Sequence, residues 1–484
     1  MKNDLRTRVF LRTERRTYYY VLKTAALALL SAAAAILPFV ISGHGVLTLR
    51  DDFNYQQLAF SILCGDFIKH GNFGWSWVTD LGSSVIGSYS FYNLASPFAL
   101  LTAWLPAAAI PYAAAPVLIL KYCTAAVLAF LFIKRFVGNP DAAVFGALLY
   151  AFCGFQTVNL IFPFHDVTAL FPLLLIGLEE LVINRRRGVF ALSVALSCML
   201  NYYFFFGQIV FLVIYFAFRF IIGETSSLHP AACETKKPET LSRKIIRRLV
   251  NAAHCIAEGL LGIGIAGVIF IPSVLSVLQN PRIGSSVSEI IFDWTRYFTI
   301  LQGYFLPADV MGSQGYFLEK ACTSCSLCLP FIAMSFVFAY MLKNKKKPLT
   351  LFAVSIIIIS CIPILNSMFS MFNSQYYARW FYMAALIFAL ISSIALSEAA
   401  AAEICRAESS DRKKDLFHKK YLIRGSAANL ICVVITIFAE AALILIFKIT
   451  GHPYLEKINI GTAYAVSSAD TACTTFRQNN TKPE

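Results

Sequence analysis

Stretches of about 20 mostly apolar residues recur along the 484-residue chain. A helix of that length can cross the hydrocarbon core of a bilayer because it pairs its backbone polar groups internally. With 58% hydrophobic and only 14% charged residues, the chain has too little polar surface for a water-soluble fold of this size. We therefore predict an all-α polytopic membrane protein with about eleven transmembrane helices. The predicted helices span residues 21–42, 113–133, 141–160, 167–183, 188–202, 204–222, 254–278, 326–342, 349–366, 377–397 and 426–448.

The charge is unevenly distributed and indicates topology. Lys and Arg outnumber Asp and Glu by 41 to 27, and most of the basic residues lie between alternate apolar segments. This pattern argues against nucleic-acid binding and predicts an amino terminus inside and a carboxyl terminus outside. The predicted units are a basic leader at 1–20, a transmembrane domain at 21–448 with outer loops at 43–112 and 279–325, and a polar tail at 449–484.

The outer loop at 43–112 has its own amphipathic pattern. Residues 53–68 place apolar side chains at a loose helical period, as in a helix that lies in the membrane interface. Downstream, Trp75 and Trp77 suit the level of the lipid headgroups, where amphipathic rings prefer to sit. We expect a large aromatic loop that carries interfacial helices.

Two short acidic motifs face the predicted outer side. Adjacent carboxylates such as Asp51 and Asp52 repel each other, so we expect a cation, a metal or a hydrogen-bond network near them. One interpretation is an exposed acidic turn beside Arg50, and the other is a general base or metal ligand. In the second motif, His165 and Asp166 precede an apolar segment, and helix capping by Asp166 is the favoured reading of that motif alone.

Two cations lie near the predicted outer ends of transmembrane helices. Lys121 is inside the second apolar segment, and Arg379 follows a polar stretch that contains Gln375. Charges at this depth are costly, so both residues suit an anionic headgroup, which Arg can hold through two parallel hydrogen bonds. The alternative for both is that the side chain extends to the interface without binding a ligand.

Several segments in order resemble the YfhO family of bacterial polytopic membrane proteins, whose members look like glycosyltransferases of the multi-spanning GT-C class. The match begins with Asp52 and Gln56, four residues apart after the first apolar segment. The other matching segments are residues 71–82 with the paired tryptophans, 88–97, 149–155, 165–179 and 201–203.

The resemblance implies an enzyme of the bacterial cytoplasmic membrane that transfers a sugar from a polyprenyl-phosphate donor to a cell-envelope polymer such as a teichoic acid. It implies a GT-C-like bundle, and partner enzymes that make and flip the donor. The family's catalytic base or metal ligand matches Asp52, with Asp51 as a competing neighbour, and the second acidic position matches His165 and Asp166. Mg²⁺ or Mn²⁺ bound by Asp51, Asp52 or Asp166 is one option. The expected substrate contacts are Gln56, Trp75, Trp77, Lys121, Gln375 and Arg379.

The chain also departs from the family, because members commonly continue into a large outer domain after the last helix. We expect residues 449–484 to be a polar tail, which leaves a truncated or minimal variant open. If the longer members choose the acceptor with that domain, this chain binds the donor without completing transfer. The two other functions considered are a transporter or flippase for lipid-linked sugars and a non-catalytic scaffold.

Overall fold

The computed structural model describes residues 2–49, 52–79, 81–92, 94–222, 240–278, 288–291, 294–306, 326–373, 378–408 and 412–450. Within these ranges the fold is helical apart from one two-stranded antiparallel hairpin, so the predicted all-α class is confirmed. The first elements are α1 (Lys2–Ser42), η1 (Phe53–Leu58), α2 (Ala59–His70), β1 (Trp75–Ser76), β2 (Ser83–Ser84), α3 (Val85–Tyr89), α4 (Pro97–Thr102), η2 (Ala107–Ala109), α5 (Ile110–Ile133), α6 (Pro140–Ala151), α7 (Gly154–Val158), η3 (Asn159–Ile161) and α8 (His165–Val182). They are followed by α9 (Val189–Leu200), α10 (Tyr202–Phe216), η4 (Ala217–Ile222), α11 (Leu241–Leu278), α12 (Trp294–Phe305), α13 (Phe331–Lys343), α14 (Pro348–Cys361), α15 (Pro363–Ser367), η5 (Met368–Ser370), α16 (Phe381–Glu408) and α17 (Arg412–Thr450).

Seven helical segments of the described chain are long and apolar enough to cross a membrane. The number is eight if α14 and the segment Pro363–Ser370, which are bent by 100°, form one broken span. All eleven predicted segments contain helix, but α8 carries three carboxylates, and α9 and α13 have only 12 and 13 residues. Charges and short length both disfavour a complete span. The expected number of about eleven is therefore higher than the seven or eight that these criteria support.

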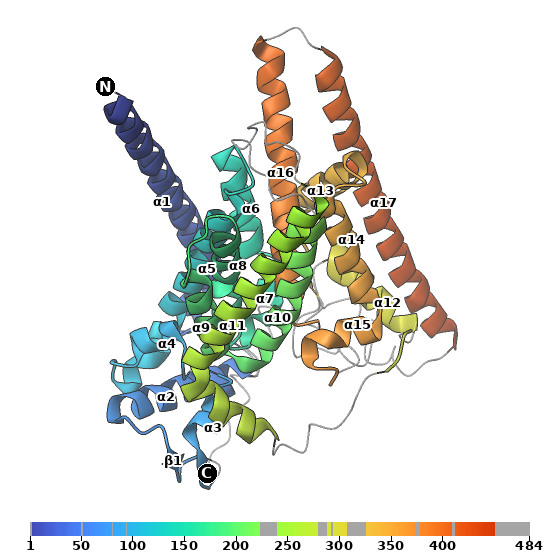
Figure 1. The fold of residues 1–484 in the computed structure, drawn as a ribbon. Helices are drawn as coiled ribbons and strands as arrows, with labels where there is room; N and C mark the ends of the chain where they lie inside the picture. The colour runs from blue at the N-terminus through green and yellow to red at the C-terminus, as the bar shows by residue number, and fades with distance from the viewer. Residues whose placement is uncertain are drawn as a thin grey trace.

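The core of the bundle surrounds the first half of α16. Every side chain from 380 to 394 is buried, and the Tyr382 ring lies against Phe155, Phe171 and Phe204 from three other helices. Helices α1 and α17 lie at opposite sides of the bundle and α11 crosses its front (Figure 1). All three expose many aliphatic side chains. In a bilayer, lipid tails are the natural neighbours of such surfaces.

The predicted loop at 43–112 is folded into short elements. The interfacial helix expected over 53–68 corresponds to η1 and α2, which together span 53–70. Strands β1 and β2 form a small hairpin, where Trp75 and Trp77 pack edge to face at 5.9 Å and remain 56% and 76% exposed. Of the other predicted loop, 279–325, residues 288–291 and 294–306 are described, and they include α12.

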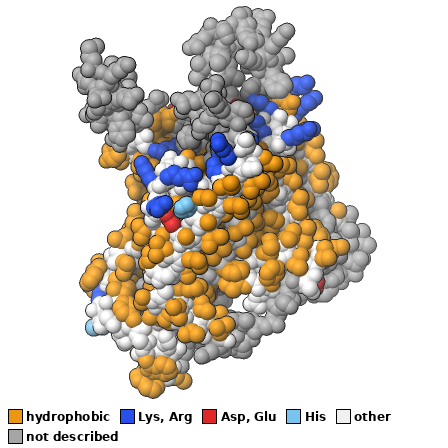
Figure 2. Space-filling model, in the orientation of Figure 1, with side chains coloured by type: hydrophobic (Ala, Val, Ile, Leu, Met, Phe, Trp, Pro, Cys, Tyr) orange, Lys and Arg blue, Asp and Glu red, His pale blue; other side chains and the backbone are white. Residues whose placement is uncertain are grey.

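The end of the molecule opposite the 43–112 loop is rich in Lys and Arg, and we call it the basic end (Figure 2). There the buried Glu179 carboxylate accepts hydrogen bonds from Arg219 Nε at 2.9 Å and from the Tyr215 hydroxyl at 2.7 Å. Its neighbour Glu180 pairs with Arg135 at 2.5 Å. These ion pairs join the ends of α5, α8 and α10, and they satisfy carboxylates that would otherwise be buried without a countercharge.

Close packing of α13 and α17 gives a testable prediction. A Cβ atom at Gly425 would lie 2.5 Å from the backbone nitrogen of Ala339 and 2.6 Å from the carbonyl oxygen of Ser335. We expect Gly425→Ala to lower the free energy of unfolding by about 1–3 kcal/mol, because the two backbones must separate. Gly264→Ala is the matched control, since nothing lies within 4 Å of that position. Equal stability of the two variants in detergent would contradict the packing.

Candidate active site

The turn at 159–166, which joins η3 to the start of α8, is where most of the described candidate residues meet. Helix α8 has 18 residues and is therefore about 27 Å long, close to the thickness of the hydrocarbon core. Since its last turn carries Glu179 and Glu180 at the basic end, its first turn lies at the end of the helix away from the basic end. The candidate residues thus lie on the side of the bundle away from the basic end.

Asp166 forms a buried ion pair with Lys121 of α5. The Lys121 Nζ atom lies 2.5 Å from Asp166 Oδ1, and the two side chains are only 13% and 6% exposed. The Ser96 hydroxyl donates a hydrogen bond to Asp166 Oδ2 and also accepts from the backbone N–H groups of Phe98 and Ala99, which caps α4. The prediction that Asp166 caps α8 is therefore wrong: among the described residues α8 has no side-chain cap, and the Asp166 carboxylate instead binds Lys121 of α5 and Ser96 at the start of α4. The Lys121 side chain is likewise mostly buried and points to Asp166.

His165 is buried beside this ion pair. Its ring lies 5.6 Å from that of Tyr122, which in turn stacks on Phe152 at 5.1 Å. Its Nε2 atom has no hydrogen-bond partner among the described residues. A buried nitrogen in this state can accept or donate a hydrogen bond when a ligand or a water reaches it.

Arg379, just before α16, contacts the aromatic side chains of the same turn. Its guanidinium group is 4.6 Å from the ring centre of Phe164 and 5.4 Å from that of Phe162. These cation–π contacts fix the position of the charge beside the turn. The turn is therefore flanked by two cations, Lys121 in an ion pair and Arg379 on two aromatic faces.

Asp52 reaches the same region through η1. The Gln56 amide donates a hydrogen bond of 2.8 Å to Asp52 Oδ1, within one turn of that helix. The neighbouring Gln57 amide donates to the carbonyl oxygen of Leu160 at 3.4 Å, which ties η1 to η3. The spacing of Asp52 and Gln56 thus has a physical meaning, because residues four apart lie on one face of a helix.

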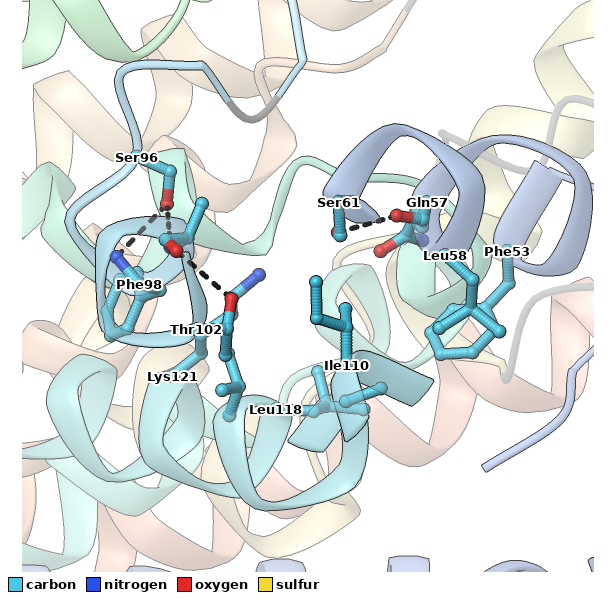
Figure 3. A pocket seen from close by; sticks show the side chains of 13 residues that line it. Phe53, Gln57, Leu58, Ser61, Ser96, Phe98, Thr102, Ile110, Leu118 and Lys121 are labelled. Carbon is cyan, nitrogen blue, oxygen red and sulfur yellow. Dashed lines mark hydrogen bonds between the residues drawn. The ribbon is translucent and has the colours of Figure 1, made fainter. Parts of the chain in front are cut away.

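A small cavity lies between η1, α4 and α5. Its volume is about 50 Å³, enough for a few water molecules or one small polar group. Figure 3 shows Ser96 and Lys121 on one side of the cavity and Gln57 and Ser61 on the other, above an apolar floor that includes Ile110 and Leu118. A cavity with hydroxyl, amide and cationic groups in apolar walls suits part of an amphiphile.

The described structure does not unite all of the predicted residues. Trp75 and Trp77 pack over Gly82 on the exposed hairpin, and no described contact joins them to the 159–166 turn. Asp51 and Gln375 lie outside the described residues. Ser96 was not predicted, although a serine directly before a proline and an apolar segment is a typical start of a helix.

A divalent cation does not fit the described carboxylates as they stand. Both Asp166 oxygens contact protein cations or hydroxyls, and Asp52 accepts from an amide. The described residues contain no group of three His, Cys, Asp or Glu side chains that could hold a metal. We therefore propose no step that depends on a metal.

The sequence matches one known protein family along most of its length. The family model described as bacterial membrane protein YfhO covers residues 13–464. The chain belongs to the YfhO family. This membership supports a multi-pass bacterial membrane protein, in agreement with the apolar helices.

One curated relative of this YfhO-family chain is the uncharacterized protein YfhO of Bacillus subtilis strain 168. The two are 26% identical over 252 residues, which cover 47% of this chain and 26% of the relative. The match thus spans about a quarter of the relative's length. The chain is also similar to the crystal structure of an apo oligosaccharyltransferase of Archaeoglobus fulgidus, with a TM-score of 0.43 and 16% identity over 87% of this chain and 56% of the other.

Proposed function

We propose that this protein is a membrane glycosyltransferase of the GT-C class, which moves a sugar from a polyprenyl-phosphate donor to a cell-envelope polymer of the teichoic-acid type. The observation that carries the proposal is the 159–166 turn. It carries His165 and Asp166, is contacted by Lys121 and Arg379, and is joined by Gln57 to η1, the helix that follows Asp52, beside a cavity with apolar walls. A lipid-linked phosphosugar carries groups that match this site, because it has an apolar tail, a phosphate anion and a hydroxylated ring.

The proposed transfer is a single displacement. Asp52 takes the proton of the acceptor hydroxyl while that oxygen forms a bond to the anomeric carbon of the sugar. The bond between this carbon and the phosphate oxygen breaks, and its electron pair leaves with the polyprenyl phosphate. The configuration at the anomeric carbon is inverted, because the acceptor attacks opposite the leaving group.

Arg379 is the cation best placed to hold the leaving phosphate. Its guanidinium group lies on the faces of Phe162 and Phe164 at the turn. A guanidinium group can bind phosphate with two parallel hydrogen bonds where negative charge develops. In the proposed site, Lys121, Gln57 and Ser61 line the cavity, which has room for one small polar group of the substrate such as a hydroxyl.

Arg379→Gln is expected to weaken binding of polyprenyl phosphate by about 10- to 100-fold, the usual value of hydrogen bonds to a charged group. The affinity of Arg379→Lys should fall between those of the wild type and Arg379→Gln, because an ammonium group lacks the planar geometry with which a guanidinium group makes two parallel hydrogen bonds. Binding can be followed by fluorescence titration in nanodiscs. Arg424→Gln, which changes an exposed arginine of α17, is the control and should bind as the wild type does. Equal affinity of Arg379→Gln and the wild type would refute this role.

A direct test uses purified protein in sealed proteoliposomes with a synthetic polyprenyl-phosphate hexose labelled in the sugar and acceptor polymer outside. We expect label to move into the polymer. Label that crosses the membrane still attached to its lipid would indicate a flippase. Bound lipid with neither movement would contradict the enzyme and favour a scaffold.

A further inference from the structure

The first three turns of α11, residues 241–250, are amphipathic and exposed. They contain the four cations Arg243, Lys244, Arg247 and Arg248, and no Asp or Glu occurs in α11 before Glu258. Among them lie five exposed aliphatic side chains. Their exposed fractions are 71% for Leu241, 46% for Ile245, 59% for Ile246, 65% for Leu249 and 44% for Val250.

The two kinds of side chain occupy different arcs of the helix. With 3.6 residues per turn, the aliphatic residues fall within about half of the circumference and the cations within the other half. The aliphatic arc continues along α11 through exposed residues such as Ile256, Leu260 and Val268. The same face that would contact lipid tails therefore extends into the basic part of the helix.

A second basic segment, Arg185–Arg187, lies beside this part of α11. Arg185 donates a hydrogen bond of 2.7 Å to the side chain of Asn251, which fixes the turn before α9 against α11. We call Arg185, Arg186, Arg187, Arg243, Lys244, Arg247 and Arg248 the α11 basic face. Figure 2 shows Lys and Arg side chains gathered at this end, at the border of the apolar surface.

Among the described residues, the α11 basic face carries more basic than acidic side chains. The two segments that form it, 185–187 and 241–250, contain these cations and no Asp or Glu. Within the described part of the chain, two nearby acids also bind other groups. Glu258 accepts from the backbone N–H groups of Gly188 at 2.9 Å and Ala191 at 3.3 Å, and so caps α9, while Glu180 pairs with Arg135 and also lies 3.4 Å from Arg186. An anionic ligand would therefore be attracted to this face.

We propose that the α11 basic face binds anionic phospholipids of the leaflet at the basic end of the molecule. Cations beside exposed aliphatic side chains match a surface that presents phosphate above acyl chains. Guanidinium groups of Arg185, Arg243 and Arg248 can hold a lipid phosphate, while Leu241, Ile245 and Leu249 contact the chains below it. This site is separate from the 159–166 turn and does not depend on the proposed sugar transfer.

The test compares phosphatidylglycerol with phosphatidylcholine. The full-length protein is exchanged into nanodiscs of phosphatidylcholine with increasing phosphatidylglycerol, and the lipid that stays bound after delipidation is counted by native mass spectrometry. We expect wild type to retain phosphatidylglycerol preferentially. The variant Arg243→Gln/Lys244→Gln/Arg247→Gln/Arg248→Gln should lose roughly fivefold in preference for each charge removed. Preference should also fall in 1 M salt, where charges are screened beyond about 3 Å.

The control variant is Lys345→Gln/Lys346→Gln/Lys347→Gln, which removes three exposed cations from the turn between α13 and α14. It should keep the wild-type preference. An equal loss in this control, or no preference for phosphatidylglycerol in the wild type, would overturn the proposal. If the quadruple variant unfolds, the pair Arg243→Gln/Arg248→Gln gives the same comparison with half of the charge removed, and an unchanged preference in that pair would also overturn it.

Discussion

Replacing Asp52 by Asn is expected to lower sugar transfer by about 10²- to 10⁴-fold, the usual contribution of a general base. An amide of the same shape can still accept the hydrogen bond from Gln56, so the local fold should persist while proton removal fails. The rate of transfer at saturating donor and acceptor measures this effect. Affinity for the lipid donor should change little, because Asp52 is not proposed to hold the phosphate.

Two carboxylates provide matched controls for Asp52. Asp66→Asn changes an exposed acid on α2 of the same loop, whose only described ionic partner is His70, and it should keep full activity. Asp51→Asn tests the adjacent acid and should retain most of the transfer. If Asp51→Asn is inactive and Asp52→Asn is active, the base has been assigned to the wrong residue of the pair.

The buried pair of Lys121 and Asp166 should have the largest effect on stability. Removing one partner leaves an uncompensated charge that is almost fully buried, so Lys121→Met or Asp166→Asn is expected to lower the free energy of unfolding by about 3–5 kcal/mol. The double variant Lys121→Met/Asp166→Asn should recover much of that loss, since neither charge then remains. Chemical denaturation in micelles gives the three values. Additive losses in the double variant would show that the two groups do not interact.

Much of the fold follows from hydropathy, because an apolar stretch of 20 residues has few alternatives to a helix in a bilayer. The interfacial helix over 53–68 was predicted in the same way, from its amphipathic period. Whether α8, α9 and α13 cross the membrane completely cannot be decided by periodicity, since their ends depend on neighbouring helices. The 100° break between α14 and Pro363–Ser370 also depends on packing, although Pro363 marks its position.

The candidate site was predictable as a set of residue types but not as a set of partners. Unusual charges in apolar segments pointed to Lys121 and Arg379, because buried charges need a reason. Asp166 and Lys121 are 45 positions apart in different helices, so the sequence could not show that the carboxylate neutralises the ammonium group. It also could not show that Arg379 packs on the rings of Phe162 and Phe164. Ser96 joins the site only through the path of the loop that precedes α4.

The most direct test of the proposed transferase is the acceptor-dependent release of free polyprenyl phosphate from a polyprenyl-phosphate hexose by the purified wild-type protein in nanodiscs, with Asp52→Asn as the blank. We predict one polyprenyl phosphate released for each sugar found on the polymer, and almost none with the Asp52→Asn variant. Retention of intact donor on the wild-type protein in the presence of acceptor, with no release, would contradict the account.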